Sequence, residues 1–252
     1  MDVKALLALI ALVISVISLL KSRKQELTMQ KIEINGYLHE AWDFMGGQKG
    51  SDTIMSFSSK NDLILARREI EKALTINPKH VKANYYQGVL FEAMKQNKDA
   101  EQSYLKSIKF SKGKEYSAFH NLGRIYLKEK KPTYALKLFC DALKSCEKKD
   151  EILYNIGVTY LDMGEQDLAI ENFKASIKEN EKYSRPYSNL IAIYGIRGEY
   201  ENAERLITSA IEHKIVDEAI HYNTLAIYRA LGNNEKIDRI NEIYQSLTEL
   251  NK

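Results

Sequence analysis

The sequence predicts an all-α protein, built from about six antiparallel helical hairpins that stack on one another and are preceded by a single N-terminal transmembrane helix. Three observations predict this fold class. The body of the chain repeats with a period of about 34 residues, only 12 glycines and 3 prolines interrupt its 252 residues, and the first 24 residues are much more apolar than the rest.

The overall composition is that of a folded protein, with 44% hydrophobic and 28% charged residues. The formal net charge of +3 is far from the strongly basic balance that binding to nucleic acid usually needs. We therefore expect no nucleic-acid partner.

The first element is an apolar run from Ala5 to Leu20 that contains no charged residue. As a helix it spans roughly 24 Å, and Val3 with the aliphatic stem of Lys4 extends it toward the roughly 30 Å of a bilayer core. A cleavable signal peptide is the alternative, but no small-x-small cleavage site precedes the basic KSRK sequence. We interpret residues 1–24 as a retained transmembrane anchor with its basic flank.

The charges on either side of this run predict its orientation. Lys21, Arg23 and Lys24 follow the run, whereas Lys4 alone precedes it. The positive-inside rule therefore predicts a single-pass membrane protein whose repeat domain is cytoplasmic, with an outward-facing body as the alternative. Residues 25–31 are polar and are expected to form a short stalk.

Glycines recur in the body at intervals of 35 and 34 residues, as Gly88, Gly123 and Gly157. Each is followed by an aromatic residue after three positions, and by a small, an aromatic and a small residue after 12, 16 and 19 positions. These positions hold Phe91, Tyr126 and Tyr160, then Ala100, Ala135 and Ala169, then Tyr104, Phe139 and Phe173, and then Ser107, Ala142 and Ser176.

Such a pattern is what two packed antiparallel helices need. Large residues spaced by three or four share one helical face, and small residues let the two helices approach closely where they cross. A hairpin of this size cannot bury its own outer face, so neighbouring copies must stack. The turns inside the hairpins carry Gly164, Gly198 and Gly232, as expected where a helix ends in a left-handed residue, and Pro132 occupies the corresponding turn of its own copy.

In the spacing of its small and aromatic residues, residues 32–252 resemble the tetratricopeptide repeat (TPR) family. The resemblance implies a right-handed superhelical solenoid, with a degenerate first hairpin whose two helices are separated by an insertion at about residues 46–61. The other five repeats are expected at about 81–114, 116–149, 150–183, 184–217 and 218–251.

Two of these repeats depart from the pattern. Ile191 and Leu225 replace the glycine in the fifth and sixth hairpins, so we expect the helices there to separate further or to pack differently. The sixth hairpin also has Ile237 for a small residue and Asn241 for an aromatic one. It is expected to be a capping hairpin, because terminal repeats tend to be atypical.

Residues for catalysis or metal binding do not stand out. The five histidines never pair at positions i and i+4, and the GGQKGS segment lacks the ending of a phosphate loop and follows a helix. We therefore expect no enzyme, no catalytic residue, no cofactor and no bound metal.

Asparagines stand two positions before the glycine-type position in four successive hairpins, as Asn121, Asn155, Asn189 and Asn223. In the TPR family this first helix lines a concave groove, which implies that the asparagines face a bound segment. An asparagine amide can both donate to and accept from the backbone of an extended peptide. The alternative is that these side chains only hold adjacent helices together.

Tyrosine and arginine at further groove positions are typical of recognition surfaces. The basic side chains among them are also compatible with an acidic or carboxylate-bearing ligand. One subset, His120, Arg124, Asn155, Arg185 and Asn189, is similar in layout to the carboxylate clamp of some TPR proteins, with His, Arg and Asn replacing the first Lys, the first Asn and the final Arg. The complete predicted groove is Lys82, Tyr85, Tyr86, His120, Asn121, Arg124, Tyr154, Asn155, Arg185, Asn189, Tyr222 and Asn223.

Together with the apolar N-terminal run, the resemblance implies a membrane-anchored protein–protein interaction scaffold, which binds a segment of a protein or peptide partner and assembles or regulates a membrane-associated complex. Two alternatives stay open. The chain would be a non-catalytic subunit of an enzyme complex, or an envelope or periplasmic assembly factor if its topology is reversed.

Overall fold

The computed structural model describes the backbone of residues 3–46 and 60–250, and the side chains of residues 12–46 and 61–250. Within these ranges the chain forms twelve α-helices and no strand, which confirms the all-α prediction. It divides into two compact units, residues 1–118 and 119–252, and each is described by itself. The helices are α1 (Val3–Phe44), α2 (Lys60–Ile76), α3 (Val81–Ala93), α4 (Asn97–Phe110), α5 (Tyr116–Lys128), α6 (Pro132–Leu143), α7 (Asp150–Asp162), α8 (Gln166–Glu179), α9 (Ser184–Arg197), α10 (Tyr200–Glu212), α11 (Glu218–Ala230) and α12 (Asn234–Leu250).

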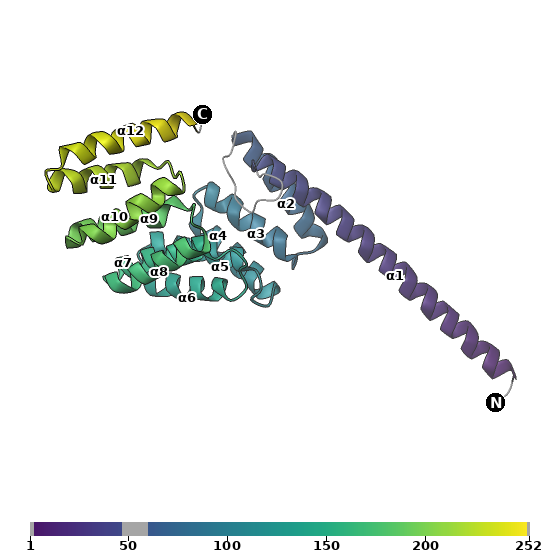
Figure 1. Cartoon of the computed structure of the whole chain (residues 1–252). Coiled ribbons are helices and arrows are strands. Elements are labelled where there is room, and N and C mark those ends of the chain that lie inside the picture. Colours follow the sequence, from purple (N-terminus) through teal and green to yellow (C-terminus); the bar gives the residue numbers. More distant parts are fainter. Residues whose placement is uncertain (1–2, 47–59, 251–252) are drawn as a thin grey trace. The chain divides into compact units, whose positions relative to one another are not determined.

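The first unit contains one very long helix, α1, of 42 residues. Its C-terminal part packs on α2, where Ile34, Leu38 and Ala41 are buried, and its N-terminal part extends away from α2 and α3 (Figure 1). The helix runs without a break through residues 25–31. The segment predicted to be a stalk is therefore a helical continuation of the first hairpin.

Among the residues that the structure describes, no helix is long and apolar enough to cross a membrane. The predicted anchor, Ala5–Leu20, lies only partly within them, because the side chains of residues 3–11 are outside the description. Most of the predicted insertion at about 46–61 also lies outside the described residues. Both features therefore stay predictions.

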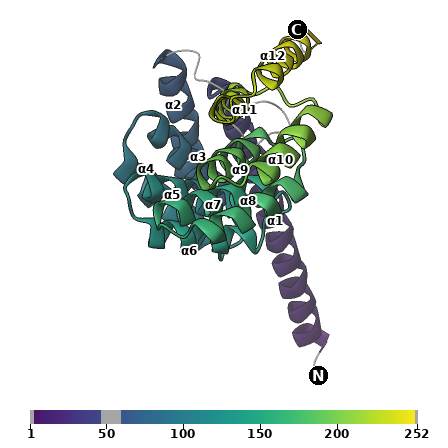
Figure 2. The same ribbon diagram turned by 60° about the vertical axis from the view of Figure 1, so that its left-hand side comes forward.

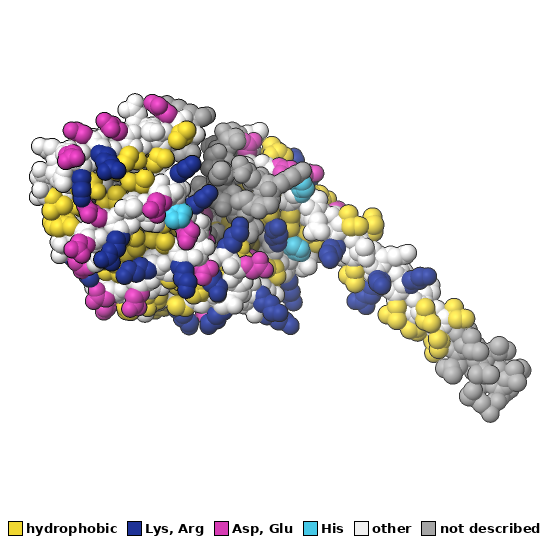
Figure 3. Space-filling model, viewed as in Figure 1, with side chains coloured by type: hydrophobic (Ala, Val, Ile, Leu, Met, Phe, Trp, Pro, Cys, Tyr) yellow, Lys and Arg dark blue, Asp and Glu magenta, His cyan; other side chains and the backbone are white. Residues whose placement is uncertain are grey.

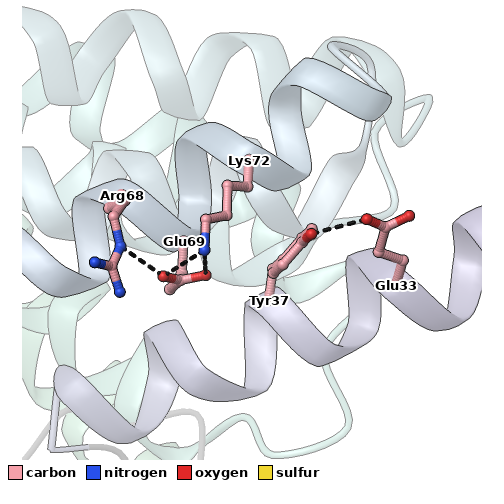
Figure 4. A network of polar contacts seen from close by, with 5 residues as sticks. All are labelled: Glu33, Tyr37, Arg68, Glu69 and Lys72. Atoms are coloured by element: carbon pink, nitrogen blue, oxygen red, sulfur yellow. Dashed lines mark hydrogen bonds and ion pairs between the residues drawn. The ribbon is translucent and has the colours of Figure 1, made fainter.

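A buried carboxylate on α2 is paired with two basic side chains of the same helix, one of which also contacts α1 (Figure 4). The side chain of Glu69 is fully buried and accepts hydrogen bonds from Arg68 Nε at 2.9 Å and from Lys72 Nζ at 2.9 and 3.0 Å. Burial alone raises the pKa of this carboxyl, but the hydrogen bonds and positive charges of Lys72 and Arg68 outweigh it and hold the pKa below its ordinary value. The ammonium of Lys72 also lies 5.1 Å from the ring centre of Tyr37 on α1, whose hydroxyl donates to Glu33 at 2.8 Å.

Three hairpins have a glycine where their two helices cross, as predicted. A Cβ atom added to Gly88 would lie 2.6 Å from the ring of Tyr104, and one added to Gly157 would lie 2.6 Å from the ring of Phe173. At Gly123 the ring of Phe139 would be 2.7 Å away. These distances are far below van der Waals contact, so the aromatic ring occupies the space that a side chain would need.

The turns inside the hairpins confirm the prediction of left-handed residues. Gly164, Gly198 and Gly232 have φ angles of +82°, +72° and +65°. The equivalent residues of the second and third hairpins are Lys95 and Lys130, with φ angles of 60° and 59°. The interpretation of Pro132 as the equivalent turn residue was therefore wrong. Pro132 is instead the first residue of α6, where its missing N–H costs nothing.

The fifth and sixth hairpins, α9–α10 and α11–α12 of the second unit (Figure 2), pack less closely than the fourth, as their sequences predict. Ile191 and Ile207 are both buried between α9 and α10, and these helices approach each other less closely than α7 and α8 do. The approach of α11 and α12 is weaker still, and Ile240 is the one buried residue of α12. Asn241, at the usual aromatic position, lies with Oδ1 2.9 Å from Nε2 of His221.

Candidate functional site

Two predicted groove asparagines connect neighbouring first helices of the second unit, one between α5 and α7 and one between α9 and α11. Asn155 Nδ2 on α7 lies 2.7 Å from Nε2 of His120 on α5, and can donate to that nitrogen when it is unprotonated. Asn223 Nδ2 on α11 donates to the backbone oxygen of Ser188 on α9 at 3.0 Å. Both asparagines therefore link adjacent first helices, which is the structural role that the sequence left as an alternative.

Asn189 on α9 differs from these two. It is half-buried, and its side-chain amide has no hydrogen-bond partner among the described residues. Asn121 on α5 does have an interaction partner. The four asparagines predicted as one ladder thus occupy different environments, and Asn189 alone of the four presents an unpaired amide within the described part of the chain.

An aromatic and basic cluster stands beside Asn189. The guanidinium carbon of Arg185 on α9 lies 6.0 Å from the ring centre of Tyr154 on α7, and the ring of Tyr183 meets that of Tyr154 edge to face at 5.5 Å. The hydroxyl of Tyr183 is buried and has no hydrogen-bond partner among the described residues. Burial raises the pKa of Tyr183, the negative charge of Glu151 raises it further, and nearby Arg185 opposes both. The phenol is therefore held neutral and able to donate.

The predicted groove residues of the first unit lie largely in its interior. Tyr85 and Tyr86 are 6% and 5% exposed, and Tyr86 stacks on Trp42 of α1 at 5.1 Å. Lys82 is exposed, with Nζ 5.4 Å from the ring centre of Tyr86. Little of either tyrosine ring is thus left for a partner to contact. By contrast, Tyr222 on α11 of the second unit is 69% exposed.

His120 and Arg124, both on α5, are also less free than their sequence positions suggest. His120 is 9% exposed, its ring packs 5.8 Å from that of Phe139, and Glu151 Oε1 lies 4.0 Å from its Nε2. Arg124 is half-buried and has an interaction partner. His120 therefore contributes to the packing of the third hairpin.

The first-helix surface of the second unit can stack on aromatic groups, pair with anions and form hydrogen bonds with a peptide backbone. No group of three or more His, Cys, Asp or Glu that could hold a metal ion occurs within the described ranges.

Two residues of this surface were missed by the sequence analysis. Tyr183 stands directly before α9, and Ser188 is the acceptor for Asn223. The spacing of 35 residues between Ser188 and Asn223 equals that between His120 and Asn155, so the repeat itself carried a signal for such a pair. Nothing in the sequence marked Tyr183.

Comparison with protein families gives a match within the second unit. Residues 150–183, which hold α7 and α8, match the family described as tetratricopeptide repeat. The limits of the matched repeat coincide with the range expected from the sequence. A comparison with curated proteins found no significant match.

Several solved structures share the fold of this chain. The structure of pilF from Pseudomonas aeruginosa is similar with a TM-score of 0.70 at 14% identity, covering 87% of this chain and 98% of that one. PilW, described as a type IV pilus biogenesis factor, gives a TM-score of 0.67 at 18% identity over 84% and 92% of the two chains. YrrB, described as a TPR protein with an unusual peptide-binding site, gives 0.55 at 16% identity over 71% and 91%. At these identities the likeness concerns the fold.

Proposed function

We propose that this protein is a non-catalytic, membrane-anchored scaffold that binds a segment of a partner protein on the first-helix surface of its second unit. The observation that carries the proposal is the environment of Asn189. Its equivalents Asn155 and Asn223 are each engaged with a neighbouring helix, whereas its own amide is unpaired among the described residues. The amide is only half-buried, so it is open to solvent and can exchange water for the backbone of a bound peptide.

The chemistry around Asn189 supports a peptide with a negative charge. Arg185 is exposed and held over the ring of Tyr154. Tyr222 adds a large exposed ring on α11. An acidic side chain or a terminal carboxylate would pair with Arg185 while the peptide backbone meets Asn189.

Site-specific photocrosslinking tests the location of the partner. A photoreactive phenylalanine analogue is placed at Tyr222 on α11 or, as the matched control, at Tyr134 on α6, which is 64% exposed. We expect adducts with a defined partner from position 222 and not from position 134. Adducts from position 134 alone would move the site to the second helices.

A second pair of variants tests the chemistry of the same surface. Arg185→Glu combined with Asn189→Ala should weaken capture of the crosslinked partner by at least about tenfold, because attraction becomes repulsion and a backbone contact is lost. Arg205→Glu makes the same charge change on α10, where the side chain is 77% exposed, and should leave capture unchanged. Equal effects of both variants would contradict the proposal.

We also propose that residues 5–20 anchor the protein and that the repeats face the cytoplasm. The exposed apolar side chains from Leu12 to Leu20 on α1 and the basic flank that follows support an anchor. The fold similarity to PilW favours a second candidate, an assembly factor of the cell envelope with the opposite topology. A tag after Lys252 that protease removes from outside intact cells would support that second candidate, and N-terminal sequencing would reveal a cleaved signal.

A further inference from the structure

Lysines line the solvent side of α4 in the first unit. Between residues 95 and 114 the sequence has six lysines and two acidic residues, a net charge of +4. Lys98, Lys106 and Lys109 share one helical face, because residues separated by 8 and 11 positions return to the same side of an α-helix. Lys95 and Lys112 stand in the turns before and after the helix, and we call these five residues the lysine stripe.

The stripe is fully available to solvent. All five lysines are exposed, and none forms an ion pair with any residue in the described part of the chain. The buried face of α4, formed by Ala100, Ser103, Tyr104 and Ser107, is on the opposite side of the helix. Asp99 and Glu101 border the stripe without neutralising it. The five like charges of the lysine stripe repel one another, so an anionic surface that neutralises them would be bound favourably.

Leu105 lies in the middle of the stripe and is 46% exposed. An apolar side chain among lysines is the composition of helices that lie on a membrane surface, where the ammonium groups meet headgroups and the apolar residue enters the interface. The stripe contains no arginine, the residue that favours bidentate contacts to phosphate or carboxylate. Its chemistry therefore fits a diffuse anionic surface better than a single anionic group.

The same unit carries a second feature that fits lipid. The N-terminal part of α1 exposes apolar side chains, among them Leu12, Ile14 and Leu19, and a basic patch follows them at Lys21, Arg23 and Lys24 (Figure 3). The alternative partner for the lysine stripe is the acidic part of a second copy of this chain. Residues 150–252 hold 18 acidic and 11 basic residues, a net charge of −7. Such a partner would explain the lysines but not the exposed apolar residues of α1 on the same unit.

We propose that the lysine stripe of α4 docks on an anionic lipid surface. The partner surface of the second unit is not involved, so this inference goes beyond the scaffold function. Each lysine near an anionic leaflet contributes roughly a fivefold gain in binding constant. The stripe would thus hold the first unit against the headgroups without any further contact.

Fluorescence quenching in vesicles tests the proposal with the full-length chain. Leu105→Trp places a reporter in the stripe, and the parent chain, with Trp42 as its single tryptophan, supplies the background. Both are reconstituted into phosphatidylcholine vesicles with or without phosphatidylglycerol, each containing brominated lipid as a quencher. We expect the reporter to be quenched strongly in the anionic vesicles and little in the neutral ones. In about 1 M salt, where the Debye length is roughly 3 Å, the quenching in anionic vesicles should be lost.

Matched charge reversals separate the stripe from the total charge. Lys106→Glu with Lys109→Glu should abolish quenching of the reporter, whereas Lys178→Glu with Lys182→Glu, which makes the same change on exposed lysines of the second unit, should leave it intact. If the first pair loses helical signal, Lys106→Gln with Lys109→Gln repeats the test. Equal quenching in both vesicle types would overturn the proposal. So would a blue shift of the reporter emission that depends on protein concentration and not on lipid, because it would assign the stripe to a second copy.

Discussion

The fourth and fifth hairpins fill the same helix crossing in two different ways. In the fourth, the ring of Phe173 lies over Gly157, and α7 and α8 approach closely. In the fifth, the same two positions hold Ile191 and Ile207, both buried, and α9 and α10 stay further apart. A crossing can thus be filled by one large side chain or by two of medium size. The two positions act as a pair, and the separation of the helices follows from the pair.

The largest change in the free energy of unfolding is expected when the fifth hairpin loses the buried side chain of Ile191. Ile191→Gly removes a fully buried side chain and places glycine inside a helix, which together should lower the free energy of unfolding by about 4 kcal/mol. Adding Ile207→Phe should recover part of this loss, because it recreates the pair of the fourth hairpin. Denaturant titration measures both. A loss below about 1 kcal/mol for Ile191→Gly would contradict the pair interpretation.

The reverse exchange in the fourth hairpin is expected to cost less. Gly157→Ile places a branched side chain where even a Cβ would lie 2.6 Å from Phe173, and overpacking of this kind costs about 1–3 kcal/mol. Phe173→Ile in the same chain should relieve the overlap. Thermal unfolding compares the double variant with Gly157→Ile. If the double variant is no more stable, the pair interpretation fails, and the close approach of α7 and α8 is required for stacking on the neighbouring hairpins.

Left-handed turn residues inside the fourth hairpin and after the fifth should give smaller changes in the free energy of unfolding, and the two changes should have opposite signs. Gly164 inside the fourth hairpin and Lys214 after the fifth both have left-handed backbones, with φ of +82° and 55°. Lys214→Gly should raise the free energy of unfolding by about 0.5–1 kcal/mol, and Gly164→Ala should lower it by about 1 kcal/mol. Lys137→Gly, inside the regular helix α6, serves as the control and should be destabilising by about 1 kcal/mol.

Replacing the asparagines of the two hairpins should change the free energy of unfolding least, but the comparison tests the proposed partner surface directly. Asn155→Ala breaks the contact with His120 and should lower the free energy of unfolding by about 1 kcal/mol, whereas Asn189→Ala should change it by less than about 0.5 kcal/mol. Partner capture should respond in the opposite order. Equal losses of stability in both variants would mean that Asn189 is also structural and would remove the main support for the proposed surface.

Much of the fold was predictable because its signals are local. The glycine at a crossing, the aromatic residue that covers it and the left-handed turn residue all lie within one repeat of about 34 residues. The continuity of α1 was also within reach. No proline occurs in its range, and its one glycine, Gly36, lies in the part that packs on α2, so nothing in residues 25–31 breaks a helix.

The candidate site was less predictable because its contacts connect different repeats. Asn155, Asn189 and Asn223 are identical in type and register, yet one meets His120, one meets Ser188 and one is unpaired among the described residues. The difference depends on which side chain the neighbouring helix presents. Likewise, Tyr86 was predicted to contact a partner, but Trp42 from the atypical first hairpin stacks on its ring.

The sequence by itself determined that this chain folds into stacked helical hairpins, where a glycine marks the crossing of their helices, and that Gly164, Gly198 and Gly232 are left-handed turn residues. These features follow from helical periodicity and from residue size within a single hairpin. Tertiary structure alone decided which groove side chains remain available, since stacking of one hairpin on the next sets whether an amide such as that of Asn189 or Asn223 meets a neighbouring helix. The repeat pattern specifies the structure of each hairpin, whereas the environment of a surface residue depends on two neighbouring hairpins together.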